Sequence, residues 1–131
     1  MHNGVAVRVY ETRIFSRFAR KESIKGKHLL EAVQRADDGL IDADLGGGLI
    51  KQRVARPGQG RSGGYRTILV FRTGSLAIFL TGFAKNEREN ISADDLEDLK
   101  LIARQWLKHP ERIEADMAAG ILNEVNNDKE S

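Results

Sequence analysis

The chain has 131 residues, 40% of them hydrophobic, which suffices for one ordinary core and falls short of two, so we expect a single domain spanning residues 1–131. The absence of cysteine excludes disulfides, thiolate zinc sites and a cysteine nucleophile, and three widely separated histidines lead us to expect no metal site and no cofactor. The net charge is +2, no apolar run approaches the roughly 20 residues that cross a bilayer, and there is no signal-peptide core, so we expect a cytoplasmic protein without a membrane partner.

The N-terminal third predicts one strand followed by two helices. Apolar residues alternate over residues 5–11, with three valines on one side, as in a half-buried strand. Ser16 is a candidate N-cap for a short helix over residues 17–22. A second helix, beginning after Gly26 and ending at Gly39, would present one apolar face, formed by Leu29, Leu30, Val33 and Ala36.

The middle of the chain predicts three strands. A glycine turn at residues 46–48 precedes a strand over residues 49–55. Residues 56–64 are rich in glycine and are expected to form a loop. Two further strands, residues 65–72 and 76–84, are separated by a short turn, which is a hairpin signal.

The C-terminal third predicts helices. Ser92 with Asp95 is a capping signal for a helix that ends near Pro110, and its apolar residues recur at helical spacing. Pro110 suits the first turn of another helix, and residues 126–131 resemble a frayed tail. The expected fold is therefore α+β: a small, mostly antiparallel sheet of about four strands with helices packed on it and a C-terminal helical pair. The apolar positions of the two last helices are Leu96, Leu99, Ala103 and Trp106, then Ile113, Met117, Ile121 and Leu122.

The small net charge conceals an uneven distribution. Residues 1–45 carry a net charge of +1, residues 46–90 carry +6, and residues 91–131 carry −5. Between Leu45 and Asn86 there is no carboxylate. The middle of the chain therefore predicts an anionic ligand.

The cations of this middle segment occupy positions suited to a phosphate chain. Lys51 and Arg53 share one face of their strand, about 7 Å apart. Arg56 and Arg61 belong to the glycine-rich segment, whose backbone could approach a sugar-phosphate chain closely. Arg66 lies among apolar strand residues, so it should be held rigidly and should need a partner.

Rigid guanidinium groups fit one requirement of RNA cleavage by the neighbouring 2′-hydroxyl. That reaction needs a deprotonated hydroxyl, stabilisation of the charge on the phosphorane and a protonated leaving oxygen. Fixed cations meet the second need without a metal. No histidine lies in the basic segment, so the general acid and base are unassigned.

Two stretches resemble the branch of RelE toxins that includes HigB. They run from Ala55 to Arg66 (ARPGQGRSGGYR) and from Gly82 to Ile91 (GFAKNERENI), and the likeness extends over about residues 45–106. The resemblance implies a compact antiparallel sheet with helices and a metal-independent endoribonuclease that cuts messenger RNA, usually on translating ribosomes. It also implies a toxin–antitoxin system whose antitoxin is often a helix-turn-helix protein.

The resemblance also assigns roles to residues. Arg66 matches the family's strand arginine at the scissile phosphate, and Lys85 and Arg88 match the cationic pair after the last strand, so these three are the candidate catalytic residues. The candidate RNA-binding residues are Lys51, Arg53, Arg56 and Arg61. Many relatives carry a tyrosine or histidine near the C-terminal end of the site, where this chain has Ile91 and Ser92.

Other interpretations of the same residues stay open. Lys51 and Arg53 could be the solvated face of an edge strand, and Lys85 and Arg88 could pair with neighbouring glutamates in a surface cluster. Tyr65 and Trp106 are expected in the core. The chain could instead be a gyrase poison of the related ParE type, or a noncatalytic nucleic-acid-binding module, for which the basic segment alone would suffice.

Overall fold

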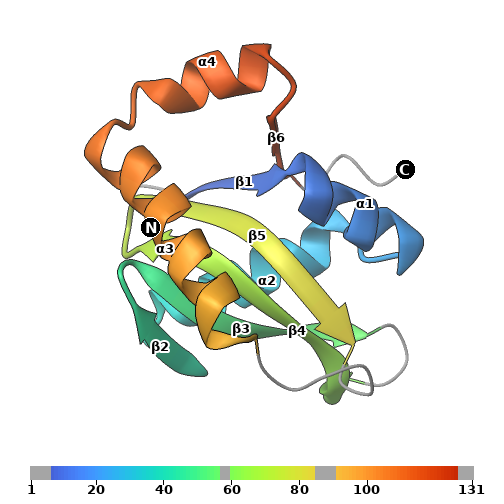
Figure 1. Cartoon of the computed structure of the whole chain (residues 1–131). Helices are drawn as coiled ribbons and strands as arrows, with labels where there is room; N and C mark the ends of the chain where they lie inside the picture. Colours follow the sequence, from blue (N-terminus) through green and yellow to red (C-terminus); the bar gives the residue numbers. More distant parts are fainter. Residues whose placement is uncertain (1–6, 57–59, 85–90, 127–131) are drawn as a thin grey trace.

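The computed structural model describes residues 7–56, 60–84 and 91–126, and for residues 60–63 the backbone alone. These residues form an α+β fold with a sheet, four helices and short connections (Figure 1). The elements are β1 (Arg8–Thr12), α1 (Arg13–Lys21), α2 (Gly26–Asp37), β2 (Ala43–Gly46), β3 (Leu49–Arg56), β4 (Gly60–Arg72), β5 (Leu76–Ala84), α3 (Ala93–Lys108), α4 (Arg112–Ala118) and β6 (Leu122–Glu124).

The sheet has six strands in the order β2-β3-β4-β5-β1-β6. The sheet is mostly antiparallel, as predicted, but it is mixed: β1 lies parallel to β5, while every other neighbouring pair is antiparallel. The predicted α+β class is confirmed, but the expected count of about four strands is too low. The two additional strands, β2 and β6, have only four and three residues and lie at the two edges of the sheet.

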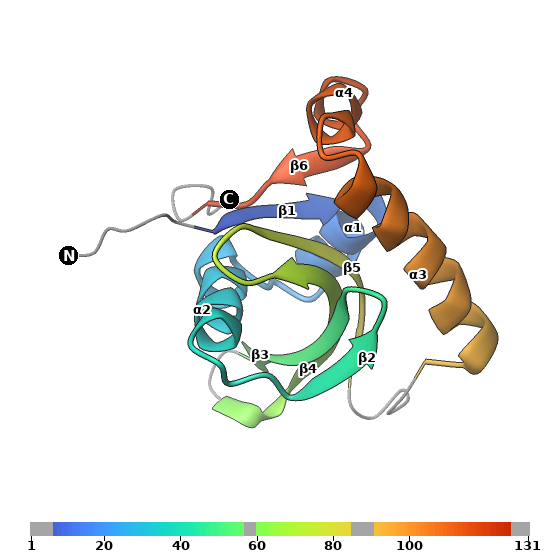
Figure 2. The ribbon, with the colours of Figure 1, turned by 90° about the vertical axis from the view of Figure 1, so that its left-hand side faces the viewer.

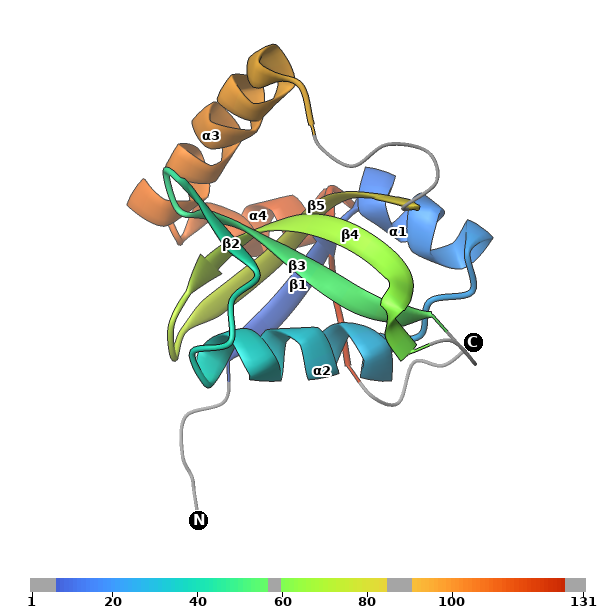
Figure 3. The ribbon, with the colours of Figure 1, turned by 90° about the horizontal axis from the view of Figure 1, so that it is seen from below.

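Helices cover both faces of the curved sheet, and each face has its own core. Figure 3 shows α2 and α3 on opposite sides of the strands, and Figure 2 shows how strongly β3 and β4 curve. One core joins α1 and α2 to the sheet through residues such as Phe15, Val33 and Phe79. The other joins α3 and α4 to it through Trp106, Ile113 and Ile78. We call these the α2 face and the α3 face.

The predicted helix starts were right at two helices and wrong at one. Ser92 caps α3 by accepting a hydrogen bond from the backbone N–H of Asp95, and α2 begins at Gly26 as expected. Helix α1, in contrast, begins four residues before the predicted position. Its N-cap is Thr12, the last residue of β1, whose hydroxyl accepts a hydrogen bond from the N–H of Phe15. The early start turns Phe15 into the core, where it is fully buried.

Two segments predicted as loop or helix are strand. Strand β4 already begins at Gly60, so the expected loop over residues 56–64 is much shorter, and Gly64 is held against the carbonyl of Val54 too closely for any Cβ. Helix α4 ends at Ala118, and Gly120 then turns the chain with φ +78°. Leu122, expected on a helix, lies in β6 and is buried.

Within the described ranges, no helix is long and apolar enough to cross a membrane.

Candidate nucleic-acid interface

Three cations predicted to bind phosphate share the α3 face of the sheet. Lys51 and Arg53 alternate with Gln52 on β3, and Arg66 lies directly opposite Arg53 on β4. The next residue across, on β5, is Phe83. The row Arg53–Arg66–Phe83 therefore crosses three strands, with neighbouring Cβ atoms about 5 Å apart. Lys51 begins the adjacent row, which continues through Ile68 to Thr81.

The backbone at Arg53 shows that this residue and Arg66 form the closer kind of antiparallel pair. The N–H of Arg53 donates to Oδ2 of Asp42 at 2.7 Å, and its carbonyl accepts from the Arg35 guanidinium. Both backbone groups thus point away from β4. In such a non-hydrogen-bonded pair the Cα atoms are about 4.5 Å apart and the side chains approach most closely.

Beyond the end of β2, the side chains of Arg35 and Asp42 form the hydrogen bonds that a neighbouring strand would otherwise make with β3. Strand β2 pairs with β3 only as far as Ala43 and Lys51, so the backbone of Arg53 would otherwise face solvent at the sheet edge. Arg35 reaches it from α2 and is itself held by Glu31 at 3.0 Å. The position of Arg53 is therefore fixed by side chains from two other segments.

Gln52, between the two β3 cations, is a fully buried polar anchor. Its amide nitrogen donates to the carbonyls of Ala32 and Leu40, each at 3.0 Å, and its amide oxygen accepts from the N–H of Asp42. The hydroxyl of Thr67 donates to its backbone carbonyl at 2.7 Å. These bonds join β3 to α2 and to the α2–β2 connection, so the strand that carries Lys51 and Arg53 is held firmly.

The pairing of two arginines is electrostatically unfavourable by itself. Like charges directly opposite on a sheet destabilise it. Arg53 is exposed and Arg66 half-buried, and no ion pair joins either guanidinium to a carboxylate in the described part of the chain. An anion bound between the two guanidiniums would remove the repulsion, and a phosphate has the oxygen spacing to accept from both.

Helix α3 borders this face. Its C-terminal half is held against the sheet by Ala103 and Trp106, whose indole N–H donates to Asp116 at 2.8 Å. It passes over the β2–β3 turn, where Leu107 comes so near Gly48 that a Cβ there would lie 2.4 Å from its methyl group. The turn thus requires glycine for close packing as well as for its φ of +86°.

Arg56 lies apart from this group. A register shift between Val54 and Arg56 interrupts the alternation of β3, and the Arg56 guanidinium lies 5.8 Å from the ring centre of Tyr65. Tyr65 is buried, as predicted, on the α2 face, with its hydroxyl 3.0 Å from Oε1 of Glu22. Burial and the bond to Glu22 raise the pKa of Tyr65, which makes its hydroxyl a weaker acid.

For the three remaining predicted site residues, the structure describes no side chain. Arg61 lies in the first residues of β4, where the backbone alone is described, and Lys85 and Arg88 lie outside the described residues. Ile91 packs against the core of the α3 face, and Ser92 is the cap of α3. Ile91 and Ser92, which the resemblance placed at the C-terminal end of the site, therefore have structural roles here.

Sequence reasoning missed the residues that hold the site. Arg35 and Asp42 belong to segments without any phosphate-binding signal, and their contacts with β3 depend on tertiary structure. Thr81, half-buried on the same face, was also overlooked. One signal of a firmly held strand was present in the sequence: on β3, a glutamine separates the two cations Lys51 and Arg53. No cluster of metal-ligating side chains occurs among the described residues.

The α+β fold presents, on one face of its sheet, an exposed arginine opposite a half-buried one with a lysine in the next row, and such a group of cations can hold an anion. The family described as the RelE toxin of the RelE/RelB toxin–antitoxin system has a sequence model that matches residues 7–125. The chain therefore belongs to the RelE toxin family, and membership implies a toxin with a cognate antitoxin. A comparison with curated proteins found no match.

Proposed function

We propose that this toxin is a metal-independent endoribonuclease that cuts messenger RNA, and that it belongs to the HigB-like branch of its family. The observation that supports this proposal most strongly is the opposed pair Arg53 and Arg66 on the α3 face. Its unfavourable repulsion is relieved by a bound phosphate. Two neighbouring guanidinium donors also suit the phosphorane, whose negative charge exceeds that of the substrate phosphate.

In the proposed reaction, the 2′-oxygen of one nucleotide attacks the adjacent phosphorus and loses its proton. The bond from phosphorus to the 5′-oxygen of the next nucleotide breaks, and that oxygen takes up a proton. The products are a 2′,3′-cyclic phosphate and a 5′-hydroxyl. Arg66 stabilises the phosphorane charge, and Lys85 and Arg88 complete the proposed catalytic set. The donor and acceptor of the two protons are not assigned.

The other cations of the segment hold the RNA chain on either side of the scissile phosphate. Lys51 and Arg53 extend the row of positive charge along β3, and we assign Arg56 and Arg61 to flanking phosphates at the far end of β3 and β4. Binding by such contacts is independent of base sequence and weakens as salt increases. We propose messenger RNA on the translating ribosome as the substrate, which places the toxin in the cytoplasm.

Inhibition of translation would follow from cleavage of translated codons. The cognate antitoxin is proposed to be a helix-turn-helix protein. The 131 residues are proposed to act as a single toxin domain.

The first experiment compares three forms of the toxin induced in a bacterial host: wild type, Arg66→Ala and Arg72→Ala. Arg72 is a matched control because it is an exposed arginine at the other end of β4, next to the hairpin turn. Primer extension on a reporter messenger locates the cuts. We expect cuts within translated codons for wild type and Arg72→Ala, and none for Arg66→Ala.

Two results would overturn the proposal and identify a different function. Arrested growth with an intact messenger and cleaved DNA in a topoisomerase assay would indicate a gyrase poison. RNA binding that depends steeply on salt, with neither cleavage nor growth arrest, would indicate a binding module.

A further inference from the structure

A β-bulge interrupts β5 next to the arginine pair. Ile68 of β4 pairs with Thr81, whereas the next residue of β4, Leu69, pairs with Phe79. Leu80 is therefore the extra residue of the longer strand. Bulges increase the local twist of a sheet and re-aim side chains, and they recur next to active sites. This bulge decides which residues of β5 share a face with the arginine pair.

The side chain of Thr81 lies on the α3 face. Its neighbour Gly82 faces α1 on the other side of the sheet, since a Cβ there would lie 2.6 Å from the Phe18 ring, and Phe83 belongs to the core of the α3 face. Side chains alternate along a strand, so Thr81 shares the face of Phe83. It is half-buried and is a diagonal neighbour of Arg66, at a Cβ separation of about 7–8 Å. One nucleotide can therefore contact both side chains.

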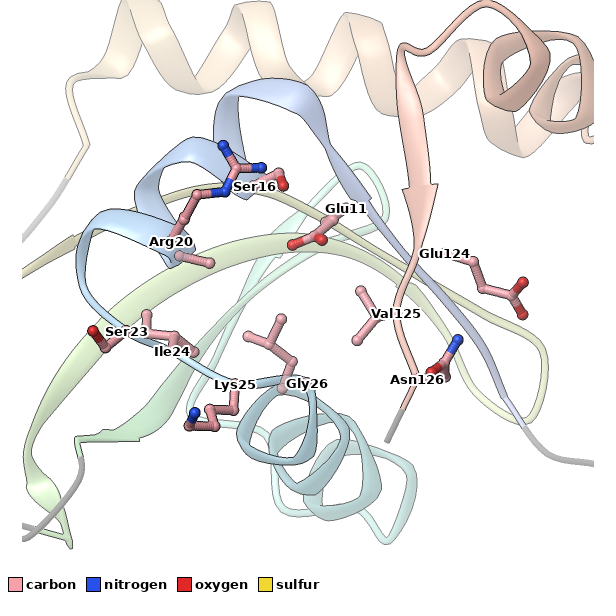
Figure 4. Close-up of a pocket in the computed structure, with 12 residues that line it drawn as sticks. Glu11, Ser16, Arg20, Ser23, Ile24, Lys25, Gly26, Glu124, Val125 and Asn126 are labelled. Atoms are coloured by element: carbon pink, nitrogen blue, oxygen red, sulfur yellow. The ribbon is translucent and has the colours of Figure 1, made fainter. Parts of the chain in front are cut away.

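The bulge is held by the residue that joins β1 to α1. The hydroxyl of Thr12 donates to the carbonyl of Leu80 at 3.2 Å while it also caps α1. The pairing of β1 with β5 ends one residue earlier, at Glu11, whose side chain faces a pocket on the α2 face (Figure 4). Thr12 thus fixes the extra residue of the bulge, and with it the place of Thr81.

The hydroxyl of Thr81 has a hydrogen-bonding capacity that the described residues do not use. Thr67 and Thr12 each donate to a carbonyl, whereas no hydrogen bond joins the Thr81 hydroxyl to another group within residues 7–56, 60–84 and 91–126. A threonine hydroxyl is neutral and offers one donor and two acceptor positions. The ribose 2′-hydroxyl is also neutral and can both donate and accept. A neutral hydroxyl beside Arg66 therefore suits a ribose, while the guanidinium suits the phosphate.

We propose that Thr81 contacts the substrate, and that its hydroxyl donates a hydrogen bond to the 2′-oxygen that attacks the scissile phosphate. This inference rests on the proposed RNA cleavage. Arg66 holds the phosphate, and Thr81 holds the attacking oxygen beside it in a reactive geometry. Thr81 keeps its own proton, so it is not the acceptor of the proton that the 2′-hydroxyl loses. Thr12 is a positioning residue, because it acts through the bulge.

The test measures single-turnover cleavage of a messenger RNA bound to the ribosome, at saturating concentrations of the full-length toxin. Thr81→Val keeps the shape of the side chain and removes the hydroxyl, so we expect a rate about threefold to tenfold lower, as for the loss of one neutral hydrogen bond. Thr81→Ser should restore most of the rate. Thr73→Val, which alters an exposed threonine in the turn between β4 and β5, is the matched control and should cleave as wild type does.

A double variant tests the role of Thr12. Thr12→Val should slow cleavage in the wild-type background and Thr12→Ser should not, with urea unfolding used to choose conditions under which every variant is folded. In the Thr81→Val background, Thr12→Val should cause no further loss, because Thr12 acts on the reaction only through Thr81. Equal losses in both backgrounds would show a merely structural role for Thr12.

A modified messenger identifies the atom that Thr81 contacts. A single 2′-deoxynucleotide at the mapped cut removes the attacking oxygen, so this RNA is not cleaved and reports binding alone. Wild type and Thr81→Val should bind it equally. Weaker binding by Thr81→Val would show a contact with another group, such as the phosphate, and would overturn the assignment to the 2′-oxygen.

The cleavage assay separates this inference from the proposed function. Equal rates for wild type and Thr81→Val would remove Thr81 from the site and leave the proposed function in place. An absence of cuts by the wild type would overturn both.

Discussion

The two faces of the sheet treat their charged residues in opposite ways. On the α3 face, Arg53 and Arg66 are brought together as like charges, and among the described residues no carboxylate forms an ion pair with either guanidinium. On the α2 face, the half-buried Glu11 lies in a pocket with a largely polar lining, and Arg20 and Ser16 are nearby. The charge distribution along the sequence pointed to the arginines of the α3 face, whereas Glu11 on the α2 face gave no such signal. What distinguishes each is whether the fold supplies a counter-charge.

The largest expected effect is on the arginine pair. Arg66→Lys retains the positive charge but loses the planar, two-pronged donor, and Arg66→Ala loses both. By analogy with removal of one fixed transition-state donor, we expect Arg66→Ala to lower the cleavage rate by about 10²- to 10³-fold. The cleavage rate is measured in single-turnover reactions on a messenger RNA bound to the ribosome, with Arg72→Ala as the control. An equally active Arg66→Ala would remove the catalytic role from the α3 face.

The next largest effect is expected on stability, when Gln52, the buried anchor between Lys51 and Arg53, is replaced. Gln52→Ala leaves the N–H of Asp42 and two carbonyls without their partner, and an unsatisfied buried polar group costs about 1–3 kcal/mol. We expect the free energy of unfolding in urea to fall by that amount. Gln34→Ala, which removes an exposed contact with Asp38, is the comparison and should have little effect. A stability of Gln52→Ala equal to that of wild type would mean that β3 is not held by this residue.

Repulsion between Arg53 and Arg66 predicts a smaller effect of opposite sign: removing one of the two charges should stabilise the fold. Arg53→Gln should raise the free energy of unfolding at low salt by roughly 0.2–1 kcal/mol, while it weakens RNA binding. The gain should disappear in sulfate, because a bound anion relieves the same repulsion in wild type. Urea unfolding with and without sulfate, together with RNA binding, measures both sides. A loss of stability in Arg53→Gln at low salt would show that Arg53 already has a stabilising partner.

The smallest expected effect is on the pH dependence of stability, to which Glu11 on the α2 face should contribute. Because burial raises the pKa of Glu11 above its ordinary value of 4.5, the folded chain binds this proton more tightly than the unfolded chain does. The free energy of unfolding should therefore fall as the pH rises from below 4.5 through the raised pKa. Glu11→Gln should lose this part of the pH dependence and exceed wild type in stability near neutral pH. Parallel slopes for wild type and variant would contradict the assigned burial.

The sequence predicted the elements with strong local signals and missed those defined by distant partners. The cap at Ser92 and the β4–β5 hairpin were evident because their determinants lie within a few residues. Strand β6 was taken for helix because Leu122 continues an apolar helical spacing, and only its pairing with Thr12 makes it a strand.

The same limit applies to the candidate site. Alternation along β3 and β4 correctly placed Lys51, Arg53 and Arg66 on faces of single strands, but their common face required the register between strands. The register shift that separates Arg56 from them leaves no local sequence signal. Arg35 and Asp42 act through β3 from more than ten residues away in the sequence, so no pattern in the chain pointed to them.

The position of β1 between β5 and β6 has a consequence for synthesis of the chain. Strand β1 emerges first from the ribosome, yet its two neighbours are β5, which ends at Ala84, and β6, which ends at Glu124. The β3–β4–β5 meander is assembled from adjacent segments and can form earlier, since local pairings close shorter loops. The meander that carries the arginine pair can therefore form before β1 pairs with β6. A chain stopped before residue 122 would carry the arginine pair but lack β6, the strand that pairs with the outer side of β1.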